Sequence, residues 1–293
     1  MGTSASSKGP VGGVPRVPQW VPTLDPPIEL AADPQDTETD SDADTEDKTA
    51  ADPQNQPAVA PPASSPIPVL APPARFGGAR TSLGRFASSG NSRDMRRGLR
   101  NYVRTGYGGS GGTARRFGGT AATANALYGM LSGSTAGQAS GTPLDPVLMA
   151  GRTAREIIDA VVEAVRPADG TQDAETQRNA IQGALSELLT LFPDADLLNL
   201  TEQQRDLAIE RFVALDVFGR FRLDVGKALQ DKSPSAKAAV ARFKEVRDYI
   251  KEIIAAAFRT LRSAGNRITA ARVKEFVRSA LVETFQVFEA YLG

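Results

Sequence analysis

The chain has 293 residues, 41% of them hydrophobic, and its 34 basic residues balance 34 acidic ones, so the formal net charge is zero. It contains no cysteine and no histidine, which excludes disulfides, thiolate chemistry, Ser-His-Asp triads and zinc sites that use Cys or His ligands. No continuous apolar run opens the chain and no stretch of about 18 apolar residues follows, so we expect a cytoplasmic protein without signal peptide or membrane span.

The zero net charge hides two blocks of opposite sign. Up to Asp52 the chain has three basic residues against eleven acidic ones, a net charge of minus eight. Residues 53–119 carry ten arginines against the single acid Asp94, a net charge of plus nine. Most large apolar residues that could build a core lie beyond Leu144. We therefore predict a disordered arm over residues 1–74, a basic connector over 75–142 and a helical bundle domain over 143–293.

The arm begins MGTS, and removal of Met1 would expose the amine of Gly2. An α-amine has a pKa of about 7.7 to 8.0, so part of it is neutral and nucleophilic near pH 7. Gly2 is thus a candidate modification site, although many chains begin Met-Gly without consequence. Thr3 and Ser4, which follow Gly2, are candidate residues for docking the arm to a partner protein.

The only tryptophan of the chain, Trp20, follows Pro15 and Pro18 in the run PRVPQWVP. This composition predicts an extended, polyproline-like segment in which Trp20 is either a docking anchor or simply solvated. Residues 33–73 are rich in Asp, Glu, Thr, Pro and Ala, and such a segment cannot offset its ordering entropy by burial. Its Pro-rich end, residues 58–73, should act as a semi-rigid spacer.

The connector contains a short helix that we expect to begin with Ser92 as its N-cap and to end at Gly106. Met95, Leu99, Tyr102 and Val103 fall on one face of it. The candidate basic residues cover much of the rest or follow shortly afterwards: Arg93, Arg96, Arg97, Arg100, Arg104, Arg115 and Arg116. A further short helix is expected from Thr113 into Leu131, weakened by glycine and threonine.

Three interpretations of these arginines remain open. They could contact nucleic-acid phosphates, with Tyr102, Tyr107 and Phe117 available for stacking. They could instead dock an acidic partner or the chain's own acidic arm, or form a simply solvated basic face. Gly106, Gly108 and Gly111 match G-x-G-x-x-G, but no apolar strand precedes them, so we interpret them as a flexible loop and not as a dinucleotide site.

Beyond the linker at residues 133–142 the pattern is helical and no strand alternation appears, so the fold class is all-α. We expect a brief helix over residues 144–150, and then one capped by Thr153 and closed by Pro167. Another ends before Pro193. Three longer helices follow, begun by a capping box at Thr201 and Gln204, by Ser235 and by Thr269. Six phenylalanines are expected in the core: Phe212, Phe218, Phe221, Phe276, Phe285 and Phe288.

No residue set indicates catalysis, a metal site or a cofactor. Two groups of charged residues at helical spacing could be imagined as acid/base pairs, but such groups are usually solvated surface ion pairs. They are Glu156, Asp159 and Glu163, and Asp216, Arg220, Arg222 and Asp224. The sequence thus predicts a protein that is not an enzyme.

Several motifs resemble the QatB family, whose members are components of bacterial Qat anti-phage defence operons. The resemblance lies in the opening MGTS followed by Gly-Pro, in Val-Pro-x-Trp, and in three segments of the connector: RFGGARTSLGRFASSG, RRGLRNYVRTGYGGS and ARRFGGT. These motifs are confined to residues 1–20 and 75–120; the helical domain is similar only in pattern.

The resemblance implies three neighbours: an ATPase, an enzyme resembling the QueC-type synthase of 7-cyano-7-deazaguanine, and a TatD-like nuclease. It suggests that the synthase-like enzyme joins a deazaguanine to the amine of Gly2. The expected function is a non-enzymatic anti-phage defence component whose helical domain docks partner proteins. The alternative is a nucleic-acid-binding adaptor that uses the arginine-rich segment.

Overall fold

The structure, a computed structural model, describes residues 74–133 and 151–291. The arm with Gly2, Thr3, Ser4, Pro15, Pro18 and Trp20, and the helix expected over residues 144–150, lie outside the described residues. The described part is 79% helical and contains no strand, which confirms the all-α fold class.

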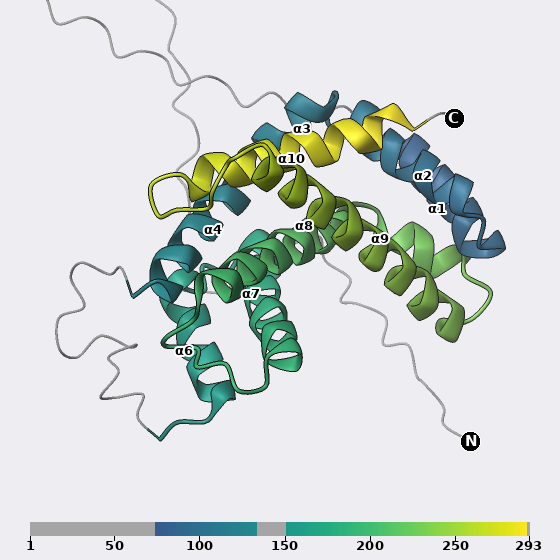
Figure 1. Ribbon diagram of the computed structural model, residues 1–293. Coiled ribbons are helices and arrows are strands. Elements are labelled where there is room, and N and C mark those ends of the chain that lie inside the picture. The colour runs from purple at the N-terminus through teal and green to yellow at the C-terminus, as the bar shows by residue number, and fades with distance from the viewer. Residues whose placement is uncertain (1–73, 134–150, 292–293) are drawn as a thin grey trace, which may run out of the picture. The chain divides into compact units, whose positions relative to one another are not determined.

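The first described helices come from the basic connector predicted over residues 75–142, which we call the basic segment (Figure 1). They are α1 (Gly77–Ser89), α2 (Ser92–Asn101), the π-helical turn η1 (Tyr102–Gly106), α3 (Ser110–Arg116) and α4 (Gly118–Leu131). The N-cap of α2 is Asn91, whose side chain accepts from the backbone N–H of Arg93, so the predicted cap at Ser92 is wrong by one residue. The single helix expected from Thr113 to Leu131 is two helices, because Phe117 leaves helical geometry between them.

The remaining helices are α6 (Ala154–Val165), α7 (Gln172–Leu191), α8 (Glu202–Lys232), α9 (Ala236–Ser263) and α10 (Val273–Ala290). Thr153, Thr201 and Ser235 are the N-caps, as predicted, and Thr153 and Thr201 form full capping boxes. Thr269 is not the cap of α10. Its carbonyl accepts from the N–H groups of Arg272 and Val273 in a preceding turn, and the helix begins at Val273.

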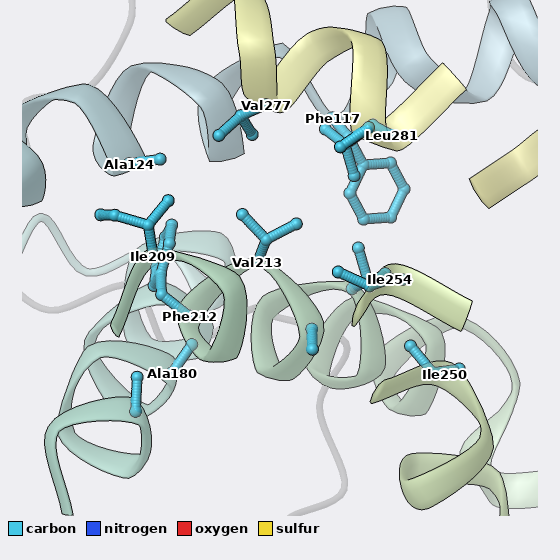
Figure 2. Close-up of a cluster of buried hydrophobic side chains, with 14 of the residues drawn as sticks. Phe117, Ala124, Ala180, Ile209, Phe212, Val213, Ile250, Ile254, Val277 and Leu281 are labelled. Carbon is cyan, nitrogen blue, oxygen red and sulfur yellow. The ribbon is translucent and has the colours of Figure 1, made fainter. Parts of the chain in front are cut away.

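Helix α8 is the centre of the packing. It contacts α1, α4, α7 and α9, while α10 contacts α2, α3, α4 and α9. Figure 2 shows where these layers meet: Ala124 of α4 and Val277 and Leu281 of α10 face Ile209 and Val213 of α8. Burial of such apolar side chains is the main stabilising contribution to a helical fold of this kind.

The hydrophobic core is larger than the sequence pattern indicated. Buried side chains from residues 76–131 and from residues 158–288 belong to one cluster, and Leu83, Phe86 and Leu99 are fully buried in it. The close approach of α1 and α2 requires Gly98, since a Cβ there would lie 2.7 Å from the side chain of Leu83. The basic segment is therefore packed on the C-terminal helices through large apolar contacts.

Candidate functional site: an arginine-rich helical face

The arginines of the basic segment lie on α1, α2, η1 and α3, apart from Arg75 in the turn before α1, and mostly point to solvent. Eight are exposed, namely Arg80, Arg85, Arg93, Arg96, Arg97, Arg104, Arg115 and Arg116, while Arg75 and Arg100 are partly buried. We call the subset predicted from the sequence, Arg93 to Arg104 with Arg115 and Arg116, the arginine face. The structure brings these residues together on neighbouring elements that all contact α10.

The opposite side of α2 fixes this orientation. Met95, Leu99, Tyr102 and Val103 are all buried, as their helical spacing predicted. Because these side chains anchor one side of α2 and η1 in the core, the arginines between them face outward, except for the partly buried Arg100.

Two tyrosines connect this segment to α8. The hydroxyls of Tyr102 and Tyr107 both donate to Oδ2 of Asp224, at 2.9 and 2.6 Å. The guanidinium of Arg80 donates to the backbone carbonyl of the same residue at 3.0 Å. Burial, and then the hydrogen bond to Asp224, raise the pKa of Tyr107 to about 12. Burial is also the largest cause of the raised pKa of Tyr102.

An aromatic cluster lies behind the arginine face. Phe76 stacks on Tyr102 with ring centroids 5.4 Å apart, and Tyr107 meets both rings edge-on. Tyr102 is 1% exposed and Phe117 is fully buried. The expectation that these rings are available for base stacking is therefore wrong for Tyr102 and Phe117, because the core occupies their faces.

The arginine face has little acidic compensation. Within residues 74–133 and 151–291, none of its seven arginines forms an ion pair with a carboxylate. Asp94 lies on α2 itself, and Glu289 at the end of α10 accepts from the backbone N–H of Ser110 at 2.9 Å. That hydrogen bond lowers the pKa of Glu289, with smaller contributions from Arg104 and Arg100. A cluster of cations without partners favours an anionic ligand.

The glycine-rich turn after η1 does not have the context of a dinucleotide site. Gly106 ends η1, and Gly108 and Gly109 have positive φ angles of 76° and 98° in the turn before α3. No strand precedes them within the described residues, and α3 has only seven residues. This agrees with the sequence interpretation, which rejected the G-x-G-x-x-G match.

The first acidic set is on the surface, as predicted. Glu156 belongs to the capping box of α6, and Glu163 pairs with Arg178 at 2.8 Å.

The second charged set, which includes Asp216 and Arg220, was expected to form solvated ion pairs, and this expectation is wrong for these two residues. Asp216 is fully buried and Arg220 is 7% exposed. Asp216 accepts from the hydroxyl of Thr120 at 2.5 Å, and Arg220 donates to Asp173 at 3.1 Å. Burial raises the pKa of Asp216 to about 6. These bonds join α4, α7 and α8, so Asp216 and Arg220 have a structural role, whereas Arg222 is exposed, as predicted.

The phenylalanines are core residues, as expected, with one exception. Phe212, Phe221, Phe276, Phe285 and Phe288 are buried, whereas Phe218 is only partly buried and lines a groove. Sequence spacing did not reveal this groove, because it depends on how α8 and α9 separate at one end.

Among the described residues there is no group of three or more His, Cys, Asp or Glu side chains that could hold a metal ion. No helix in the described ranges is both long and apolar enough to cross a membrane.

Comparison with known proteins gives one match. The family model described as QatB, Qat anti-phage system associated protein, matches residues 108–288. No curated protein and no solved structure matches the chain. The matched range begins in the turn after η1 and runs through most of α10.

Proposed function

The chain belongs to the QatB family of Qat anti-phage system associated proteins, and from this membership we propose that it is a non-enzymatic component that binds other parts of the system. The family match carries the assignment to anti-phage defence. An exposed cluster of arginines without acidic partners supports a binding role. We further propose the partners that the motif resemblance implied: a QueC-like synthase, an ATPase and a TatD-like nuclease.

For the arm, we propose that the α-amine of Gly2 is the acceptor for a deazaguanine. In this reaction the synthase-like partner first joins the carboxylate of 7-carboxy-7-deazaguanine to AMP, with release of pyrophosphate from ATP. The neutral amine then attacks the acyl carbon, AMP leaves with the electrons of the broken bond, and the nitrogen loses a proton to form the amide. Glycine suits this step because its unsubstituted α-carbon allows the amine to enter a narrow site.

The test is the intact mass of the full chain, purified with and without the synthase-like partner, followed by fragmentation of the N-terminal peptide. We expect a mass gain on Gly2 that depends on the partner and that decreases in Gly2→Ala. Gly9→Ala is the matched control and should be modified as the unchanged chain is. An unmodified Gly2 in the presence of active partner would refute this proposal and leave the family assignment intact.

A second candidate function is nucleic-acid binding by the arginine face. The observation that favours it is the exposure of Arg93, Arg96 and Arg97 on one short helix without carboxylate partners. Since Tyr102 and Phe117 are buried, such binding would rest on phosphate contacts and would be sequence-independent. Retention of the chain on DNA or RNA should therefore fall steeply as the salt concentration rises.

A further inference from the structure

A basic groove with an apolar floor lies between α8 and α9, on elements that do not carry the arginine face. It has a volume of about 850 Å³. Its apolar part includes Leu223, which is 45% exposed, and Val240, which is 69% exposed, beside the partly buried rings of Phe218 and Phe243. Large aliphatic side chains exposed together in a groove indicate a surface that a partner covers.

A second hollow of about 490 Å³ lies between α1 and the end of α8. Asp231 lines both the groove and this hollow, so the two adjoin at that residue. The cations that line them come from three helices: Arg80, Arg85, Arg222, Lys227, Lys232, Lys244 and Arg247. Asp231 is the only acidic residue in either lining.

Few of these cations are neutralised. Lys244 and Arg247 share Asp248, at 2.8 and 3.4 Å. The other five form no ion pair within the described parts of the chain. The occupant of this surface should therefore combine apolar anchors with a run of negative charge.

The chain itself contains such a segment. Residues 33–47 hold eight acidic residues and no basic one, and Ile28 and Leu30 directly precede them. We propose that residues 28–47 dock in this groove, with Ile28 and Leu30 on the apolar floor and the acidic run along the cations.

The connection between groove and arm permits this. The described chain starts at Ala74, and α1, which begins at Gly77, lines the hollow with Arg80 and Arg85. The 26 residues over 48–73 would span roughly 30 Å as a flexible chain and more as a Pro-rich one. An intramolecular segment at such a tether length has an effective concentration on the order of millimolar, so weak contacts suffice.

Docking would leave the first 27 residues, with Gly2 and Trp20, outside the groove and free to reach a partner. The inference does not depend on modification of Gly2, and its test uses the unmodified full chain.

The test is zero-length carbodiimide cross-linking of carboxylates to lysines, read by mass spectrometry on an equal mixture of ¹⁵N-labelled and unlabelled chains. We expect links from residues 33–47 to Lys227, Lys232 and Lys244, at several-fold higher yield than to the exposed Lys274 of α10. Peptide pairs should carry one isotope only, because the contact lies within one chain. Links of mixed isotope would show that the arm of a second copy occupies the groove, and equal yields at Lys274 would show that the arm has no preferred site; either result overturns the proposal.

A variant pair separates groove docking from general charge attraction. Leu223→Ser with Val240→Ser should lower the link yield several-fold, because the apolar floor is removed while the charge of the groove is unchanged. Leu191→Ser with Val287→Ser, at side chains of α7 and α10 that are 57% and 37% exposed, is the matched control and should leave the links unchanged. Links that persist in the Leu223→Ser, Val240→Ser variant would refute docking in the groove.

Discussion

The hydroxyl of Tyr107 donates a 2.6 Å hydrogen bond to Oδ2 of Asp224, which ties the glycine-rich turn after η1 to α8. Tyr102 donates to the same oxygen at 2.9 Å. These bonds connect residues 117 and 122 positions apart in the chain. They hold the element that carries the arginines against the longest helix of the described residues, so the face is presented on a fixed support.

Replacement of Tyr107 by Phe should lower the free energy of unfolding at neutral pH by about 1 kcal/mol, the net value of one hydrogen bond. The pKa of Tyr107 is raised from 10.0 to about 12 in the folded chain. Its contribution is therefore complete below pH 10 and is lost as the pH rises through about 12. Denaturant unfolding over this range should show the difference between the two proteins shrinking, and a difference that stays constant would contradict the prediction.

Replacement of Leu99 by Ala should destabilise the whole described fold by about 2 to 5 kcal/mol, because this buried side chain leaves a cavity. Leu99 of α2 belongs to the same cluster as Phe221 of α8. Unfolding by circular dichroism should therefore remain a single transition that moves to lower denaturant concentration. Leu191→Ala, at a side chain that is 57% exposed, is the control and should change little. Two separate transitions, with only one of them affected, would show that the basic segment unfolds on its own.

Local signals predicted much of this structure. A capping box can be recognised from sequence because its two partners lie three residues apart, and the predicted box at Thr201 and the predicted N-cap at Thr153 are confirmed. The inward face of α2 was recognised for the same reason, since helical spacing brings Met95 and Leu99 together.

Long-range contacts were not predictable in this way. Asp216 and Arg220 have the i, i+4 spacing of a surface ion pair and approach each other to 3.8 Å, yet both side chains are buried. Thr120 of α4 and the half-exposed Asp173 of α7 provide their further partners. Tyr102 and Phe117 similarly had the composition of a stacking surface, and only tertiary packing shows that their rings face inward. The groove at Leu223 and Val240 likewise depends on the placement of α8 against α9.

The capping box at the start of α8 gives a prediction about the longest described helix. Thr201 accepts a hydrogen bond from the N–H of Gln204, and the side chain of Gln204 accepts one from the N–H of Thr201. Thr201→Ala should cost about 1 kcal/mol of stability, the usual value of an N-cap. Thr201→Ser keeps the hydroxyl and should restore most of it. Thermal unfolding of the three proteins measures this, and equal destabilisation in both variants would show that the methyl group, not the cap, matters.

The arginine face gives the prediction that separates a binding surface from a solvated one. The triple variant Arg93→Gln, Arg96→Gln and Arg97→Gln removes three exposed charges and no buried side chain, so the fold should be retained. If the face binds nucleic acid, the affinity for a mixed-sequence oligonucleotide should fall at low salt. The slope of log affinity against log salt should become shallower by about 1 for each arginine that no longer neutralises a phosphate, up to about 3.

The matched control removes the same number of exposed charges from other helices and loops, by Arg155→Gln, Arg267→Gln and Arg278→Gln. Both triple variants have the same net charge, so a general weakening of attraction would affect them equally. A larger effect of the α2 variant locates the binding site at the arginine face, because salt largely screens charges that lie more than about 10 Å from the bound phosphates. Equal effects of the two variants on affinity would show that the arginine face contributes only to a general positive charge of the surface. Absence of any salt-sensitive retention by the unchanged chain would dispose of nucleic acid as the ligand and would leave two interpretations of these arginines, an acidic docking partner or a solvated face.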